Sequence, residues 1–400
     1  MSASTKLRMT ATSRVGRGGR VEACRLAENP LITPTDVIPT APDLEVVCAF
    51  NPGTTRFKDE FILLLRVAER PVLGAVPASH ARKLDLSGTD PVRLPLDPRD
   101  RPEDLIGLAL LDTSTEEPLV SVGYLRRDTP GLNMGDPRDI KFLERSYLSQ
   151  ISHLRLARSR DGIHFTIADR PAIAPQNSME EYGCEDPRIT QIDDTYYITY
   201  VTPSRFGITT SLASTTDFVN FERHGVIMLP DHKDVTIFPG RCRGRYAAFT
   251  RPMPHSFGKI HGMWMAYSDD LLSWRDHRPV VMPRAGMWDE LRTGGSAVPF
   301  RVDEGWLALY HGVDHTNRYC MGAVLLDADD PHRVIARSPE PILQPEADFE
   351  LKGFFGNVVI SCGHVPLDDR GERIRMYYGA ADSVTAAADF SVSDIVASLR

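Results

Sequence analysis

Short runs of alternating apolar and polar residues recur along the chain, and each run is followed by a turn signal. Five units read as a strand, a turn and a second strand rich in aromatic and aliphatic residues, which is the pattern of a β-hairpin. The units are FNPGTTRFKDEFILLLRV from Phe50, EDPRITQIDDTYYITYV from Glu185, FPGRCRGRYAAFTRP from Phe238, SAVPFRVDEGWLALYHGV from Ser296 and NVVISCGHVPLDDRGERIRMYYGAAD from Asn357.

A second element recurs between the hairpins, as SRDGIHF, STTDFVNF, SDDLLSW and a weaker DADDPHRVI. Its aspartates, Asp161, Asp217, Asp270 and Asp329, follow one another at intervals of 56, 53 and 59 residues. Four strands make one propeller blade, and this interval fits one blade. The pattern predicts an all-β protein, a five-bladed β-propeller with the first strand of each repeat nearest the axis. A β-sandwich is the alternative, but it does not explain the period.

One segment breaks the period. Residues 71–147 are too long for a loop and too polar for a separate core, so we predict an insertion in the first blade. Residues 1–28 begin with five basic side chains and have no acid before Glu22, which predicts a flexible arm. Residues 29–400 are then a single five-bladed propeller domain.

Composition excludes several classes of protein. The net charge of -8 argues against a nucleic-acid partner, since phosphate backbones need a basic field. The sequence has no run of about 18 apolar residues, so we expect no membrane span. The apolar segment of a secretory signal is also absent from its first residues. We therefore expect a cytoplasmic protein.

The six cysteines lie far apart and form no CxxC pair. This spacing suits buried, reduced thiols better than a disulfide framework or a zinc site. The sequence therefore predicts no metal.

If the five hairpins are radially equivalent, the starts of their first strands and the ends of their second strands surround one central pocket. One end of this pocket then collects two carboxylates and several cations, as a site for a sugar and an anion requires. These residues are Arg66, Asp186, Lys233, Arg251, Arg292, His311 and Asp382.

The motifs FNPG, LLLRV, CEDPRIT, KDVTIFPGR, FTRP, LYHGV and YYGAAD, in this order, resemble those of glycoside hydrolase family 130, the β-mannoside phosphorylases and related β-mannosidases. The resemblance covers most of the chain outside the arm and the insertion. It implies a five-bladed propeller. It also implies that the general acid acts through the 3-hydroxyl of mannose.

Carried over by motif, the resemblance places the general acid on Asp186. It places sugar-holding residues on Asn51, Arg66 and Asp382, and the phosphate-holding cations on Lys233, Arg251, Arg292 and His311. The chain departs from many members of the family at Lys233-Asp234, where they have Arg-Asn, and at Gly240, where they have glutamate. For Glu185 a sugar-binding role and a turn-capping role stay equally open. Tyr182 and Trp288 are candidates for stacking on a sugar because they lie beside these residues in the sequence.

The chemistry also follows from the residue types. Cleavage of a glycoside needs an acid for the departing oxygen and a nucleophile on the other face of the ring. Phosphate is already anionic, so it needs cations to position it and no base. The cations favour phosphorolysis. Together with the family resemblance, this predicts an inverting β-mannoside phosphorylase that acts on a β-mannosyl di- or oligosaccharide and gives α-mannose 1-phosphate, with inorganic phosphate as co-substrate and no other cofactor. A β-mannosidase and a noncatalytic carbohydrate-binding propeller are the alternatives. The sequence leaves the β-1,2 or β-1,4 linkage open, and a homo-oligomer is compatible with it.

Overall fold

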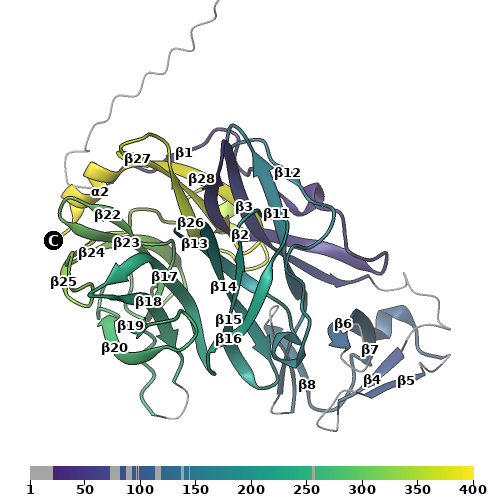
Figure 1. The fold of residues 1–400 in the computed structure, drawn as a ribbon. Helices are drawn as coiled ribbons and strands as arrows, with labels where there is room; N and C mark the ends of the chain where they lie inside the picture. The colour runs from purple at the N-terminus through teal and green to yellow at the C-terminus, as the bar shows by residue number, and fades with distance from the viewer. Residues whose placement is uncertain are drawn as a thin grey trace, which may run out of the picture.

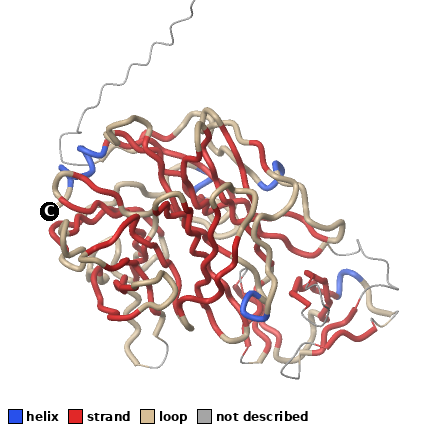
Figure 2. Tube along the Cα trace, viewed as in Figure 1, coloured by secondary structure: helices blue, strands red, loops and turns tan. Residues whose placement is uncertain are grey.

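The computed structural model describes residues 21–72, 82–86, 92–95, 97, 99–112, 119–136, 139–143, 145–254 and 257–400. The first 20 residues of the predicted arm lie outside this range. Strands dominate the described part of the chain (Figure 2), which confirms the all-β prediction. The helices found there are short: η1 (Pro34–Asp36), η2 (Pro102–Asp104), η3 (Ser178–Glu180), α1 (Asp348–Leu351) and α2 (Val392–Ser398). None of them has the length and apolar character needed to cross a membrane.

Five antiparallel sheets hold most of the strands (Figure 1). The first sheet runs β2 (Leu44–Phe57), β3 (Glu60–Pro71), β11 (Ile151–Ser159), β12 (Thr166–Ile167). The second runs β13 (Glu185–Ile192), β14 (Thr195–Ser204), β15 (Gly207–Thr215), β16 (Glu222–Met228). The third runs β17 (His232–Cys242), β18 (Arg245–Pro252), β19 (Met263–Ser268), β20 (Arg275–Val281).

The last two sheets are less regular. The fourth runs β21 (Arg292–Gly295), β23 (Gly305–Val313), β24 (Tyr319–Leu326), β25 (Val334–Arg337), with β22 (Phe300–Val302) also paired to β23. The fifth runs β26 (Val359–Pro366), β27 (Arg373–Ala380), β28 (Val384–Ser391), β1 (Cys24–Arg25), so it combines both ends of the described chain. The five predicted hairpins are the pairs β2–β3, β13–β14, β17–β18, β22–β23 and β26–β27, and all five are confirmed.

The second predicted element is the turn between the third and fourth strands of a sheet. Asp161, Asp217 and Asp270 each accept hydrogen bonds from the backbone N–H groups two and three residues further on. In the fourth sheet Asp327 has this role and accepts from the backbone N–H of Asp329 and of Asp330. The prediction that Asp329 is the equivalent of Asp161, Asp217 and Asp270 is therefore wrong by two residues, because this turn lacks the serine that marks the others.

Five hydrophobic clusters fill the spaces between the sheets. Each contains side chains of two sheets, and the pairs are first–second, second–third, third–fourth, fourth–fifth and fifth–first. Every one of the five sheets is therefore packed on both faces, which explains why their strands are rich in apolar residues at consecutive positions.

Two further sheets form between β3 and β11, where the sequence predicts the insertion. One runs β5 (Val92–Pro95), β4 (Arg82–Asp85), β7 (Leu119–Arg126), β6 (Leu105–Asp112), and the other runs β10 (Arg145–Leu148), β9 (Asp139–Phe142), β8 (Leu132–Asp136). They lie at the lower right of Figure 1 and share a hydrophobic cluster of their own.

A buried set of one carboxylate, one tyrosine and one arginine recurs in three sheets. The carboxylate lies in the segment before the first strand, the tyrosine on the second strand and the arginine on the fourth. The sets are Glu180, Tyr200 and Arg223; Asp289, Tyr310 and Arg337; and Glu350, Tyr378 and Arg25. The tyrosine hydroxyls donate to the carboxylates over 3.1, 2.8 and 2.7 Å. Each set ties the segment that leads into a first strand to the outer edge of the sheet.

Removal of one such carboxylate should destabilise the fold. Asp289 is 0% exposed and accepts hydrogen bonds from Arg284, Arg337 and Tyr310. Asp289→Ala leaves two guanidinium groups without their counter-charge, so we expect it to lower the free energy of unfolding by about 3–5 kcal/mol in urea denaturation. Asp269→Ala, which removes an exposed ion pair with Arg275, is the control and should change little. Equal effects of the two substitutions would contradict this role of the buried set.

Candidate active site

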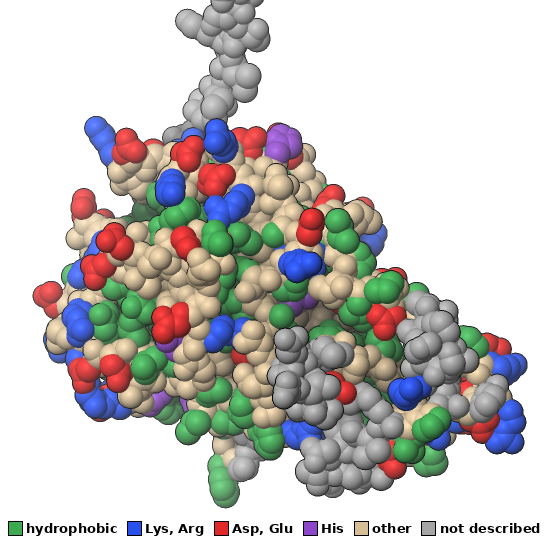
Figure 3. All heavy atoms as spheres, turned by 45° about the vertical axis from the view of Figure 1, so that its right-hand side comes forward, with side chains coloured by type: hydrophobic (Ala, Val, Ile, Leu, Met, Phe, Trp, Pro, Cys, Tyr) green, Lys and Arg blue, Asp and Glu red, His purple; other side chains and the backbone are tan. Residues whose placement is uncertain are grey.

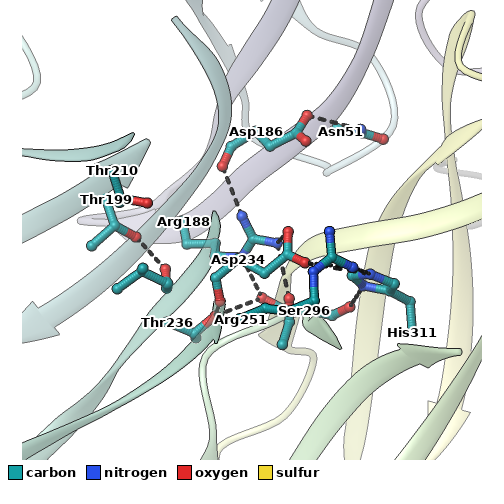
Figure 4. Close-up of polar contacts among 12 residues, drawn as sticks. Asn51, Asp186, Arg188, Thr199, Thr210, Asp234, Thr236, Arg251, Ser296 and His311 are labelled. Carbon is teal, nitrogen blue, oxygen red and sulfur yellow. Dashed lines mark hydrogen bonds and ion pairs between the residues drawn. The ribbon is translucent and has the colours of Figure 1, made fainter. Parts of the chain in front are cut away.

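Three first strands are interrupted by a β-bulge at an Asn or Asp. The register shifts between Phe50 and Gly53 in β2, between Glu185 and Arg188 in β13, and between Lys233 and Thr236 in β17. At these bulges Asn51, Asp186 and Asp234 take φ angles of 44°, 44° and 57°. Asn and Asp tolerate this left-handed conformation better than other residues with a side chain, and a bulge redirects the side chain it carries. The three short polar side chains lie together in the close-up of the site (Figure 4).

Asp186 is held by two donors. Its Oδ1 accepts from Asn51 Nδ2 at 2.9 Å and from Arg66 Nη1 at 3.0 Å. The same guanidinium donates to Glu185 Oε1 at 2.7 Å and to Ser152 Oγ at 3.1 Å. Both carboxylates are buried, so Arg66 is the shared counter-charge of two adjacent acids.

The two acids respond to this environment in opposite directions. Burial raises the pKa of Glu185, and Arg66 offsets this only in part. Burial alone would also raise the pKa of Asp186, but the charges of Arg66 and Lys233 and the hydrogen bond from Asn51 outweigh it and lower the pKa. Neighbouring carboxyl groups whose pKa values are pushed apart are typical of acid–base sites.

Arg188 joins this group to a second one. Its side chain is buried, and it donates to the backbone oxygens of Asp186 at 2.9 Å and Ser296 at 3.1 Å and to Asp234 Oδ1 at 3.2 Å. Arg188 is not among the site residues predicted from the sequence, although it lies two residues after Asp186 in the motif EDPR. An arginine in the first strand of a predicted hairpin was the available signal, because a guanidinium that is buried in a sheet needs partners.

The second group is centred on Asp234. Arg251 Nη1 lies 3.1 Å from Asp234 Oδ2 and 3.2 Å from His311 Nε2. Burial would raise the pKa of Asp234, but Arg251 and other nearby positive charges hold it well below its usual range. Gly294 faces this pair: a Cβ there would come within 2.4 Å of both Asp234 Oδ2 and His311 Cε1. The carboxylate and the ring occupy the space that a side chain at Gly294 would need.

Several donors around the second group have no partner. Lys233 forms no hydrogen bond or ion pair with the residues that the structure describes, yet its charge contributes to the pKa values of Asp186 and Asp234. The Nε atoms of Arg251 and Arg292 are buried without a hydrogen-bond partner. Buried donors are rarely left unsatisfied, so this cluster suits an anion.

The remaining sequence-predicted residues divide into two kinds. Asp382 lies close enough to Arg66 for its charge to raise the pKa of that guanidinium. Tyr182 packs with Tyr147 in the cluster of the two further sheets, at a ring-centroid distance of 5.9 Å. Trp288 stacks on Tyr310 at 5.4 Å in the cluster between the third and fourth sheets. Both aromatic rings are buried in core clusters, so their assignment to sugar stacking is not carried forward.

A comparison with known proteins identifies the family. The profile of the family described as beta-1,4-mannooligosaccharide phosphorylase matches residues 138–400. The chain belongs to glycoside hydrolase family 130. This confirms the resemblance that the motifs indicate.

Two curated relatives in family 130 cover much of the chain. The beta-1,2-mannobiose phosphorylase of Listeria innocua is 41% identical over 380 residues, which are 94% of this chain and 98% of that protein. Its structure in complex with beta-1,2-mannobiose matches with a TM-score of 0.82 at 40% identity, over 94% of this chain and 98% of that chain. The 1,2-beta-oligomannan phosphorylase of Thermoanaerobacter sp. is 40% identical over 62% of this chain and 82% of that protein.

The close fit at Gly294 gives a test of the second group. In Gly294→Ala the new methyl group must displace Asp234 or His311, and a displacement of about 1 Å at a site can cost about a hundredfold in rate. We expect that loss in kcat/KM with an unchanged circular dichroism spectrum. Gly240→Ala is the matched control, because a Cβ at Gly240 meets nothing within 4 Å. Full activity of Gly294→Ala would show that the arrangement of Asp234 and His311 does not matter for turnover.

Proposed function

We propose that the protein is an inverting β-mannoside phosphorylase that converts a β-mannoside and inorganic phosphate into α-mannose 1-phosphate and a shortened sugar. The observation that carries this proposal is a buried acid, Asp186, beside a cluster of donors without partners at Lys233, Arg251 and Arg292. The acid serves the departing oxygen, and the donors hold the phosphate that attacks the anomeric carbon from the other face.

The reaction breaks the bond from C1 of mannose to the glycosidic oxygen and forms a bond from C1 to a phosphate oxygen. Asp186 supplies the proton that the departing oxygen needs, by way of the 3-hydroxyl of mannose as the family resemblance implies. Phosphate near Lys233 offsets a positive charge that lowers the pKa of Asp186 in the free enzyme, so its binding favours the protonated acid. Phosphate therefore acts both as the nucleophile and as the group whose binding favours protonation of Asp186.

Hydrolysis would need a second carboxylate free to activate water. Glu185 accepts a hydrogen bond from Arg66. Asp234 accepts one from Arg188 and forms an ion pair with Arg251. Both candidate bases are therefore paired with cations, while nearby donors have no partner. The sequence-based preference for a phosphorylase is also borne out by the curated relatives, which are named phosphorylases.

The substrate we propose is a β-1,2-linked mannoside. The relative that matches over nearly its full length is named a beta-1,2-mannobiose phosphorylase, and a second is named a 1,2-beta-oligomannan phosphorylase. The mannose unit would be held by Asn51, Arg66, Glu185 and Asp382, which gather around Asp186.

We also propose that the five sheets are the blades of a five-bladed propeller. Five hydrophobic clusters between successive sheets, the last between the fifth and the first, support a closed ring. A pocket of about 360 Å³ supports it as well, because its lining comes from the first strand of four sheets and from the segment after β21 in the fourth.

The cytoplasmic location, a homo-oligomer and the bounds of the insertion stay predictions.

The direct test is a product assay. We expect β-1,2-mannobiose to yield α-mannose 1-phosphate and mannose when inorganic phosphate is present, because the donor cluster binds phosphate and not water. Without phosphate, little free mannose should form. Chromatography of the products with a panel of β-1,2- and β-1,4-mannosides measures both reaction type and linkage. Equal release of mannose with and without phosphate would identify a hydrolase and overturn the proposal.

Replacement of the acid tests its assignment. Asp186→Asn keeps the shape of the side chain but cannot deliver a proton, so we expect kcat to fall by about 10²–10⁴-fold with the fold intact. The rate of phosphorolysis of β-1,2-mannobiose is the measurement, and the thermal unfolding curve is the control for folding. A kcat within about tenfold of the wild type would show that another group is the acid.

A further inference from the structure

We infer that His311 is an uncharged hydrogen-bond acceptor which, together with Asp234, positions Arg251 for phosphate, and that it is not itself a phosphate-holding cation. The inference rests on the proposed function for the identity of the anion. The state of the ring, however, is a property of the enzyme that can be measured without any turnover.

The geometry around the ring determines which nitrogen carries the proton. His311 Nε2 lies 3.2 Å from Arg251 Nη1 (Figure 4). A guanidinium group can only donate, so Nε2 must accept and the ring must be neutral. The proton is then on Nδ1, which lies 3.2 Å from Ser296 Oγ and donates to it. The opposite tautomer would direct Nε2–H at Asp234 Oδ2 over 3.5 Å, which is longer than a normal hydrogen bond.

The surroundings also disfavour a charged ring. His311 is 2% exposed, and the ring of Tyr319 from β24 lies 6.2 Å from it. The charged groups that face it are Arg188 from β13, Lys233 and Asp234 from β17, and Arg251 from β18. Burial is the main cause that lowers the pKa of His311 to about 3; Asp234 opposes the shift and the three cations add to it. A positive imidazolium would therefore be buried among three positive side chains and one negative one.

This arrangement fixes Arg251 at one end of its guanidinium. Asp234 and His311 both meet Nη1, whereas Nε is buried and has no partner. Arg251 thus stays oriented through Nη1, while its Nη2 has no hydrogen-bond partner among the described residues and is left for the anion. A fixed guanidinium loses less freedom when it binds phosphate than a mobile one does. His311 acts on phosphate through Arg251, which makes it a positioning residue.

Two substitutions distinguish whether His311 acts as a hydrogen-bond acceptor or as a cation. In His311→Gln, the amide oxygen can take the place of Nε2 as acceptor, whereas His311→Leu leaves Arg251 without it. We expect His311→Gln to keep the KM for phosphate within about threefold of the wild type. His311→Leu should raise it about tenfold or more, the effect of a lost hydrogen bond to a charged group, with the KM for β-1,2-mannobiose little changed. Lys233→Ala is the reference for the loss of a cation. If both substitutions at 311 raise the KM for phosphate as much as Lys233→Ala, His311 is a cation and the inference is wrong.

A spectroscopic measurement decides the state of the ring without activity. Long-range ¹H–¹⁵N spectra of the full chain labelled at histidine report the tautomer and charge of each ring, and the signals of His311 are those absent from His311→Gln. We expect a neutral ring with the proton on Nδ1 from about pH 8 down to pH 5, where an ordinary histidine with a pKa near 6.5 becomes charged. An imidazolium at neutral pH, or a proton on Nε2, would overturn the inference. This result stands even if His311→Leu fails to fold. Failure of the proposed function would appear separately, as no phosphate-dependent product from the wild type.

Discussion

A buried guanidinium holds the two halves of the site together. Arg188 donates to Asp186, Asp234 and the backbone between Gly295 and Ser296, so one side chain links the second, third and fourth sheets. Its charge is out of water and has to be compensated where it lies, which fixes the spacing between the acid and the anion cluster. The distance between Asp186 and the donors around Asp234 is therefore set by Arg188, a residue to which we assign neither acid chemistry nor phosphate binding.

The positive and negative side chains around Arg188 nearly balance each other in charge. Asp234 stands where many family members have asparagine, and it offsets part of the positive charge that a phosphate site needs. An uncharged His311, as we infer, adds no positive charge to the site. Lys233 and Arg292, which have no ion-pair partner in the described part of the chain, are then the cations that no carboxylate offsets. In the function we propose, cations that are shared with fixed carboxylates would hold phosphate and still release a charged product.

The hairpins could be predicted because they depend on local signals, whereas the gathering of Arg66 and Asp186 was predicted from the repeat and the place of Asn51 from the family resemblance. Turn residues and alternation mark the strands in the sequence itself, and Asn51-Pro52 and Asp186-Pro187 mark two of the three bulges; Asp234 is followed by valine and has no such signal. Tyr182 and Trp288 were assigned by adjacency in sequence, but both lie in turns before a strand, where position in the sequence does not fix the direction of a side chain, and their rings pack into core clusters. The buried carboxylate, tyrosine and arginine sets had no local signal. Arg25 and Glu350, for instance, are 325 positions apart.

The pairing of β1 with β28 has a consequence for how the protein is made. The fifth sheet takes its outer strand from the beginning of the described chain and its other strands from the end. On the ribosome, this sheet cannot form until nearly all of the chain has emerged, although the second and third sheets are complete long before. Until the fifth sheet forms, the first and fourth sheets each have one apolar face uncovered, a period in which a nascent chain is prone to aggregate or to need a chaperone.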